Sequence, residues 1–336
     1  MVPLLPAGPL SHAASMPRIG TARGQWPAFR GASACVASSC IVMSSLLRFL
    51  EPWEPSFGLV LMFVAAAVLF ARGTLRQRVS VARQGAFWTG LALLYVALHT
   101  RVDYYAEHQF FVHRLQHLVL HHLAPLLIMS AYPGSVLRAG MPLRWRGALH
   151  RAARWRASRA AGAVLLNPTF ISLAFVISVV FWLMPSVQFI SMLDWRIYVF
   201  MNWSVTISGL LYWWMLLDHR PSPPSRVKPG LRVLSPVITM TPQILAGAII
   251  TFSSRDLYPI FTLCGRAMDL SPALDQSLGG LIMWVPAAVI ETIGGLMALR
   301  HMMRLSTLPP RRANARRGPS AAVRVVTASA SQAGRT

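Results

Sequence analysis

Long, uninterrupted apolar blocks are the feature that most constrains how this sequence can fold. Between residues 57 and 299, seven such blocks follow one another, separated by stretches that are arginine-rich, acidic or polar. A helix needs about 20 mostly apolar residues to cross a bilayer. Charged residues make up 12% of the chain, against about a quarter in a soluble domain. We therefore expect an all-α, polytopic integral membrane bundle.

The limits of these blocks define the predicted spans. The seven ranges are 57–71 (short for a span), 86–104, 110–132, 165–184, 197–217, 231–252 and 278–299. The sixth contains Pro236 and Pro242, so we expect a bent helix whose freed carbonyls need partners. Together the blocks predict a seven-transmembrane-helix domain over residues 56–304.

The two ends of the chain lack this apolar pattern. Residues 1–55 show no sustained period and are predicted to be a disordered extension, or an upstream reading with the working start at Met43. A signal-like segment at 34–50 is the alternative. Residues 305–336 are rich in Pro, Arg, Ala and Ser, which predicts a basic disordered tail with affinity for lipid headgroups.

Arginine placement predicts the orientation of the bundle. The connections after the first, third and fifth blocks, and the C-terminal tail, are rich in arginine, whereas the alternate connections are balanced or acidic. The positive-inside rule then places the N-terminus outside and the C-terminus in the cytoplasm. The arginines that give the net charge of +22 lie between the apolar blocks and in the tails. We therefore expect membrane lipids as partners and no nucleic acid.

The third block carries histidines at a regular spacing. His113, His117 and His121 recur every fourth residue, which on an α-helix places them along one face, each about 6 Å above the last. Ionisable side chains inside a bilayer usually mark a pathway or a ligand site. His113 with His117, or His117 with His121, is close enough to share one metal ion, and other helices would complete the shell. An inert, hydrogen-bonded seam is the alternative interpretation.

Further candidate ligands lie on the predicted outer side. Histidine, thiolate and thioether together favour copper, especially Cu(I), and zinc is the second choice. His99 has a structural alternative as a span-end residue facing headgroups, and Cys264 has one as a small buried residue in a tight turn. The predicted metal ligands, in order, are His113 and His117, then His99, His121 and Cys264.

Two other polar features lack a clear role from sequence. Glu291 lies deep in the seventh block, where it is either protonated and hydrogen-bonded to Thr292, Gln243 or a histidine, or a proton acceptor. The segment 218–224, which begins Asp-His-Arg-Pro, predicts a rigid turn with a charged cap, structural or for docking.

Short motifs follow one another over about residues 56–304. They are His113-Arg-Leu-Gln-His117 with the later Leu-Ala-Pro125-Leu-Leu, Met201-Asn-Trp-Ser204, Gly209-Leu-Leu-Tyr-Trp213, the 218–224 turn, Met240-Thr-Pro-Gln243, Asp256-Leu-Tyr-Pro259, Leu263-Cys-Gly-Arg266 and residues 275–286. In this order they resemble the multi-span CtaG family of cytochrome c oxidase assembly factors.

The resemblance implies a multi-pass protein of the bacterial inner membrane, needed to mature a haem-copper oxidase by helping to deliver or insert copper. Oxidase subunits and periplasmic copper chaperones would be its partners. Many relatives carry a second histidine pair on the span that corresponds to the fifth block. This chain has Tyr198 and Asn202 there. The remaining metal ligands would then have to come from His99, Cys264 or a methionine.

We therefore expect a non-enzymatic assembly factor that binds copper near its outer face through His113 and His117. One alternative is a membrane transporter for copper or another divalent ion, in which Glu291, Gln243 and the sixth span line a path. A second is a haem-binding electron-transfer protein with axial histidines. A third is a structural scaffold whose histidines only pack.

Overall fold

The computed structural model describes residues 50–53, 56–222, 225 and 227–307, and most of these residues are helical. No strand occurs in these ranges, which agrees with the predicted all-α class. The expectations for the N-terminal extension, its start site and the basic tail beyond residue 307 lie outside the described residues.

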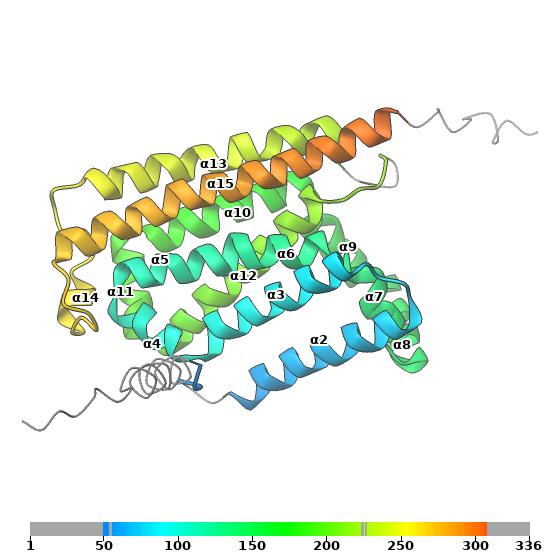
Figure 1. Cartoon of the computed structure of the whole chain (residues 1–336), viewed down its shortest axis with the longest axis horizontal. Coiled ribbons are helices and arrows are strands. Elements are labelled where there is room, and N and C mark those ends of the chain that lie inside the picture. The colour runs from blue at the N-terminus through cyan, green and yellow to red at the C-terminus, as the bar shows by residue number, and fades with distance from the viewer. Residues whose placement is uncertain (1–49, 54–55, 223–224, 226, 308–336) are drawn as a thin grey trace, which may run out of the picture. The chain divides into compact units, whose positions relative to one another are not determined.

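The helices follow one another with short connections (Figure 1). In chain order they are α2 (Phe57–Arg76), α3 (Val81–His99), α4 (Arg101–His108), α5 (Phe110–Leu118), the π-helical turn η1 (Val119–Leu123), α6 (Ala124–Ser130), α7 (Pro133–Gly140), α8 (Leu143–Arg154), α9 (Arg156–Leu165), α10 (Pro168–Leu183), α11 (Pro185–Leu193), α12 (Trp195–Leu216), α13 (Pro229–Phe252), α14 (Ile260–Leu263) and α15 (Pro272–Ser306).

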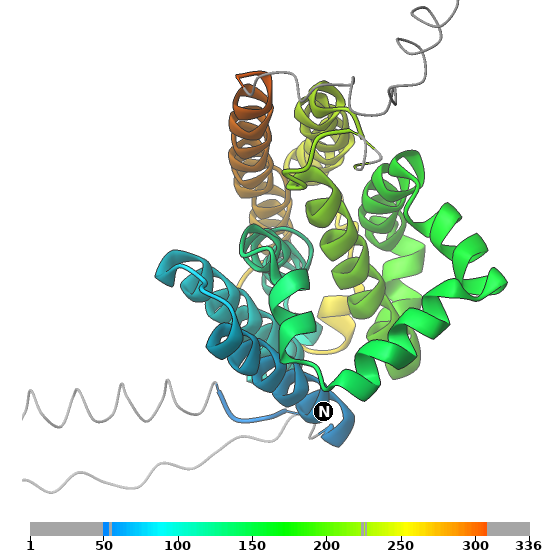
Figure 2. The same cartoon turned by 90° about the vertical axis from the view of Figure 1, so that its right-hand side faces the viewer.

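The histidine-bearing segment lies in the middle of the bundle. Helix α5 packs against α15, η1 packs against α12, and α6 packs against α3. Helices α13 and α15 pair along their length on one side, and α2 lies on the other (Figures 1 and 2). Other helices therefore cover most of the third predicted span, although Leu115 is exposed, and its histidines are buried.

Four helices are long and apolar enough to cross a membrane: α2, α3, α13 and α15. The pair α9 and α10, bent by 63° at its break, makes a fifth if it is counted as one span. The third predicted span is divided into α5, η1 and α6, each too short alone, and α12 carries Asn, Ser, Thr and Tyr residues that lower its mean hydropathy. The structure supports a membrane protein with several apolar helices. Seven spans and the orientation stay predictions.

Local capping explains where the helices depart from the predicted ranges. The second range was expected to reach residue 104, but α3 ends at His99 because the side chain of Thr100 accepts a hydrogen bond from the backbone N–H of Val102 and begins α4. The fourth range was expected to begin at residue 165, but Asn167 caps α10, which begins at Pro168. Helix α13 continues through both of its internal prolines.

Candidate functional site

The start of the histidine helix is fixed to α15 by a buried carboxylate. Asp275, which is fully buried, accepts hydrogen bonds from the backbone N–H groups of Phe110 (3.1 Å) and Phe111 (2.8 Å). A carboxylate at this place satisfies two of the donors that the first turn of a helix leaves free and complements its dipole. Arg266 forms an ion pair with the same carboxylate. These contacts fix the position of α5 along the axis of α15.

His113 and His117 form the first histidine pair on this helix. Their ring centroids are 4.4 Å apart, and both rings are buried. The side-chain amide of Gln188 donates to His113 Nε2 at 3.2 Å, while the carbonyl oxygen of the same side chain accepts from Arg114 Nη2 at 2.8 Å. Two imidazole nitrogens that share one ion at about 2 Å each lie about 3–4 Å apart. The 4.4 Å between the ring centroids is close to this separation.

Two residues of α12 face this pair. The Tyr198 ring lies 6.2 Å from the His113 ring, and its hydroxyl donates to Asp103 Oδ1 at 2.7 Å. Asn202 is buried and interacts with His117. These are the positions at which the resemblance leads one to expect a second histidine pair, and the structure places them beside the first pair.

A π-helical turn interrupts the histidine helix at its centre. The N–H of Ala124 donates to the carbonyl of Val119, five residues back. Pro125 has no N–H, so the carbonyl of His121 lacks its usual donor four residues later. The indole N–H of Trp213 fills that role at 3.1 Å. Such turns occur often at functional sites.

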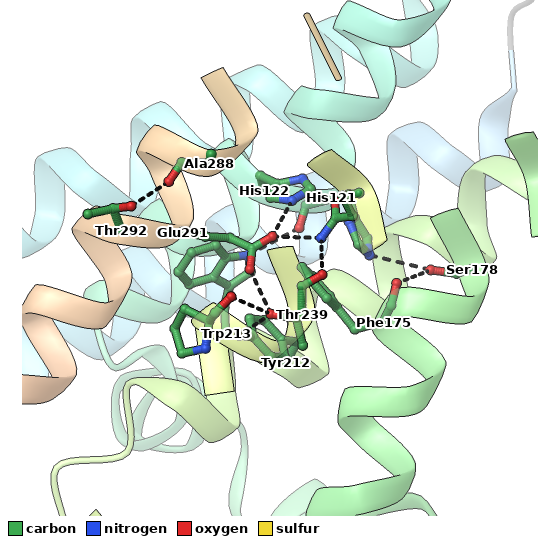
Figure 3. Close-up of polar contacts among 12 residues, drawn as sticks. His121, His122, Phe175, Ser178, Tyr212, Trp213, Thr239, Ala288, Glu291 and Thr292 are labelled. Atoms are coloured by element: carbon green, nitrogen blue, oxygen red, sulfur yellow. Dashed lines mark hydrogen bonds and ion pairs between the residues drawn. The ribbon is translucent and has the colours of Figure 1, made fainter. Parts of the chain in front are cut away.

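The π turn ends the single histidine stripe that the sequence spacing predicts. His121 stacks on Phe175 at 3.9 Å, and its Nε2 lies 3.4 Å from the hydroxyl of Ser178. His122 points instead to α15, where its Nε2 lies 3.2 Å from Glu291 Oε1 (Figure 3). His121 and His122 thus form a second group, with partners different from those of His113 and His117.

Glu291 is the centre of a buried polar network (Figure 3). Its side chain is fully buried and accepts from Gln243 Nε2 and Thr239 Oγ1, both at 2.7 Å. The predicted partners Gln243 and a histidine are confirmed. Thr292 is wrong, because its hydroxyl donates to the carbonyl of Ala288 at 2.7 Å, within its own helix. Thr239 was missed, although it lies one helical turn before Gln243 on the same face.

The buried histidines keep ring nitrogens without a hydrogen-bond partner among the described residues. These atoms are Nδ1 of His99, His113, His121 and His122, and Nε2 of His117. Buried polar atoms normally have a partner, so each of these calls for a ligand or water. Three of these residues, His117, His121 and His122, line a cavity of about 30 Å³, and that volume admits one small ligand.

The remaining predicted ligands lie apart from the first pair. His99 is buried and lines a cavity of about 240 Å³, on the side predicted to be the outer one, together with Asp103, Tyr198 and Asn202. Cys264 is exposed at the end of α14. Within the described residues, no three His, Cys, Asp or Glu side chains lie close enough to hold one metal ion. The structure thus brings together pairs of candidate ligands and no larger set.

Comparison with known proteins gives one match. A family model described as cytochrome c oxidase caa3 assembly factor (Caa3_CtaG) matches residues 60–305, which include almost all of the described helices. Neither a curated protein nor a solved structure matches the chain.

Proposed function

Since the chain belongs to the cytochrome c oxidase caa3 assembly factor family, we propose that it binds copper through His113 and His117 in the bacterial inner membrane. From this site it assists delivery of the metal to an oxidase subunit, or its insertion there. The role requires positioning and release of an ion and no covalent chemistry, so the proposal describes a non-enzyme.

The main support is the close pairing of two buried imidazoles, whose ring centroids are 4.4 Å apart. His117 Nε2 has no hydrogen-bond partner among the described residues, and copper would bind His113 at Nε2 in place of the Gln188 amide, because a neutral ring that accepts there carries its proton on Nδ1. Neutral imidazole is a good ligand for copper. A closed shell of protein ligands suits a permanent structural ion, whereas an incomplete set leaves coordination positions open. An incomplete set therefore fits a cargo that has to be passed on.

The outer cavity supports a route between this pair and the outside. It is lined by His99, Asp103 and Glu107 on one side and by Tyr198 and Asn202 on the other. Tyr198 and Asn202 also lie against His113 and His117. An ion in this cavity would meet the carboxylates of Asp103 and Glu107 and the imidazole of His99, with Tyr198 and Asn202 between it and the histidine pair.

The test compares Cu(I) binding by the purified full-length protein with that of the double variant His113→Ala, His117→Ala. Competition with a chromogenic Cu(I) chelator measures the affinity. We expect a loss of at least about 100-fold, since removing even the outer partners of a ligand costs 10–100-fold. His150→Ala is the matched control, because His150 is exposed on α8. Equal affinity of the double variant and the control would refute the proposal.

A membrane transporter for copper is the second candidate, and the Glu291 network favours it. Glu291, His122, Gln243 and Thr239 place ionisable and polar groups deep between α13, α15 and η1, next to the cavity of about 30 Å³. Uptake of radioactive copper into proteoliposomes distinguishes the two functions. Uptake that Glu291→Gln abolishes would establish transport, and binding without uptake would leave the assembly role.

A further inference from the structure

The arginine-rich end of the bundle contains a second polar cavity, which is lined by none of the histidines of the two groups above. Its volume is about 500 Å³. The lining side chains come from α3, from the junction of α6 with α7, from the segment after α12 and from the end of α15. They are Arg83, Tyr132, Ser135, His219, His301, Arg304 and Leu305. Nothing in the copper proposal uses these residues.

An unusual backbone conformation points Tyr132 into this cavity. Tyr132 has φ 49° and ψ 56°, and among the described residues other than glycine it is the one with positive φ. A bulky residue adopts this region rarely, and strained positions of this kind cluster at functional sites. The Tyr132 hydroxyl lies 3.0 Å from His301 Nε2, and its ring contacts the ring of His219 edge-on at 4.6 Å.

Arg83 contacts both the backbone next to Tyr132 and the Tyr132 ring. Its Nη2 and Nε donate to the carbonyl of Ala131 at 2.7 and 3.0 Å, and its guanidinium lies 5.4 Å from the centre of the Tyr132 ring. The fold therefore brings a guanidinium, a phenol and two imidazoles to one place. His301 Nδ1 has no hydrogen-bond partner among the described residues.

The charge of the cavity is positive. No carboxylate is present among the described residues that line it, whereas two guanidinium groups are. The nearest acidic side chain on the same segment, Asp218, is already paired with Arg220 through two contacts of 2.9 Å. Guanidinium, imidazole, phenol and hydroxyl groups are all donors that suit phosphate oxygens. The cavity is thus complementary to a phosphate group.

An adjoining, mostly apolar cavity indicates whether that phosphate is a free ion or part of a lipid. It has a volume of about 370 Å³, shares Arg304 with the first cavity, and is lined by Leu296, Leu299 and Met303 beside Arg300 and Thr307. Leu296 and Met303 are each 59% exposed. A free phosphate ion makes no favourable contact with such apolar side chains, whereas lipid acyl chains do. We propose that the two cavities bind one anionic phospholipid of the phosphatidylglycerol type, with its phosphate against Arg304, His301 and Tyr132 and its chains along α15.

The experiment measures the thermal unfolding midpoint of the full-length protein in neutral detergent against added phosphatidylglycerol, phosphatidylcholine or inorganic phosphate. A ligand that binds the folded state raises the midpoint. We expect phosphatidylglycerol to raise it clearly more than phosphatidylcholine. Arg304→Gln and His301→Gln each weaken the apparent binding of phosphatidylglycerol by about fivefold or more, which corresponds to one basic contact with an anionic lipid.

Arg78→Gln is the matched control. It removes one arginine from the exposed loop between α2 and α3, at a position that lines neither cavity. An equal response of the Arg304 and Arg78 variants would overturn the proposed site. A full shift by inorganic phosphate alone would overturn the lipid and assign a free anion. An equal effect of phosphatidylcholine would overturn recognition of the anionic headgroup.

Discussion

Glu291 shows at the scale of one residue how a carboxyl group is kept between apolar helices. Three groups converge on its two oxygens: the Gln243 amide, the Thr239 hydroxyl and the His122 imidazole. Leaving a buried donor without an acceptor costs about 1–3 kcal/mol. Each of these contacts therefore helps to keep the carboxyl group of Glu291 buried.

The hydrogen bonds of Glu291 predict different effects for two substitutions of this residue. Glu291→Ala leaves His122 Nε2 without its partner and opens a cavity, whereas Thr239 and Gln243 keep backbone carbonyls of α13 as acceptors; we expect a loss of about 2–4 kcal/mol of unfolding free energy. Glu291→Gln keeps one acceptor oxygen and the side-chain volume, and we expect about 1 kcal/mol. Unfolding of the purified protein in a detergent titration measures both.

Thr292→Ala provides the control for this pair. The Thr292 side chain is exposed and bonds to its own helix, so a change within about 0.5 kcal/mol is expected. If Glu291→Ala were no less stable than Thr292→Ala, the network would contribute nothing to the fold.

At this scale the sequence predicted part of the site. The pair His113 and His117 follows from the four-residue spacing alone, because that spacing is local to one helix. Gln188, which orients His113, and Trp213, which binds the carbonyl of His121, were not predicted. Both come from helices distant in sequence, and no periodic pattern encodes which helix face meets another.

Among the elements, the histidine helix departs most from its sequence pattern. A uniform α-helix was expected from residue 110 to 132, but the π turn divides it where Pro125 removes a backbone donor. The proline is visible in the sequence. The π turn that results is not visible in the sequence, because it depends on two residues of α12. Gly209 lets the backbone of α12 approach that of His121, and Trp213 supplies the donor that Pro125 lacks.

Gly209→Ala tests this close approach. A Cβ atom at Gly209 would lie 2.5 Å from the carbonyl oxygen of His121, so the π turn must shift. We expect a net destabilisation of about 1–3 kcal/mol from overpacking. Thermal unfolding measures the change, and Cu(I) competition reports whether His117 and His121 have moved.

Gly85→Ala is its matched control on α3, since a Cβ atom there meets nothing within 4 Å. Alanine has the higher helix propensity by about 1 kcal/mol, so this variant is expected to be as stable as the wild type or more so. Equal stabilisation by both substitutions would show that α12 does not press on the π turn.

Across the whole molecule, the two ends of the bundle differ in charge. Helices α4, α11 and α14 lie at one end, and α7 and α8 with their arginines lie at the other (Figure 1). Apolar blocks and the arginine alternation were enough to predict a helical membrane bundle. They were not enough to fix the number of spans, because the third and fifth predicted spans carry the polar residues of the site and so lose the apolarity on which such counting depends.

Labelling in intact cells with a membrane-impermeant maleimide tests the orientation. Cys264 is exposed at the predicted outer end, and we expect it to react from outside. A cysteine placed at the exposed Arg144 of α8, in a chain whose native cysteines are replaced by serine, should react only after permeabilisation.

Labelling of the Arg144 position from outside would place His99 and the cavity lined by Asp103 and Tyr198 on the cytoplasmic side. Copper would then have to come from the cytoplasm. The lipid site does not depend on this result, since anionic lipid is available to either face.

The π turn also changes the direction in which the second histidine group faces relative to the first. Because it adds a residue to the local winding, the part of the chain before Val119 and the part after Leu123 are rotated relative to one another by roughly the 100° that one residue spans on a helix. A tightening of that turn by one residue would swing His122 away from Glu291 while His113 and His117 stayed anchored through Asp275. The winding of the middle of this helix therefore determines which partners His121 and His122 reach, while the contacts of Asp275 fix the start of the segment that carries His113 and His117.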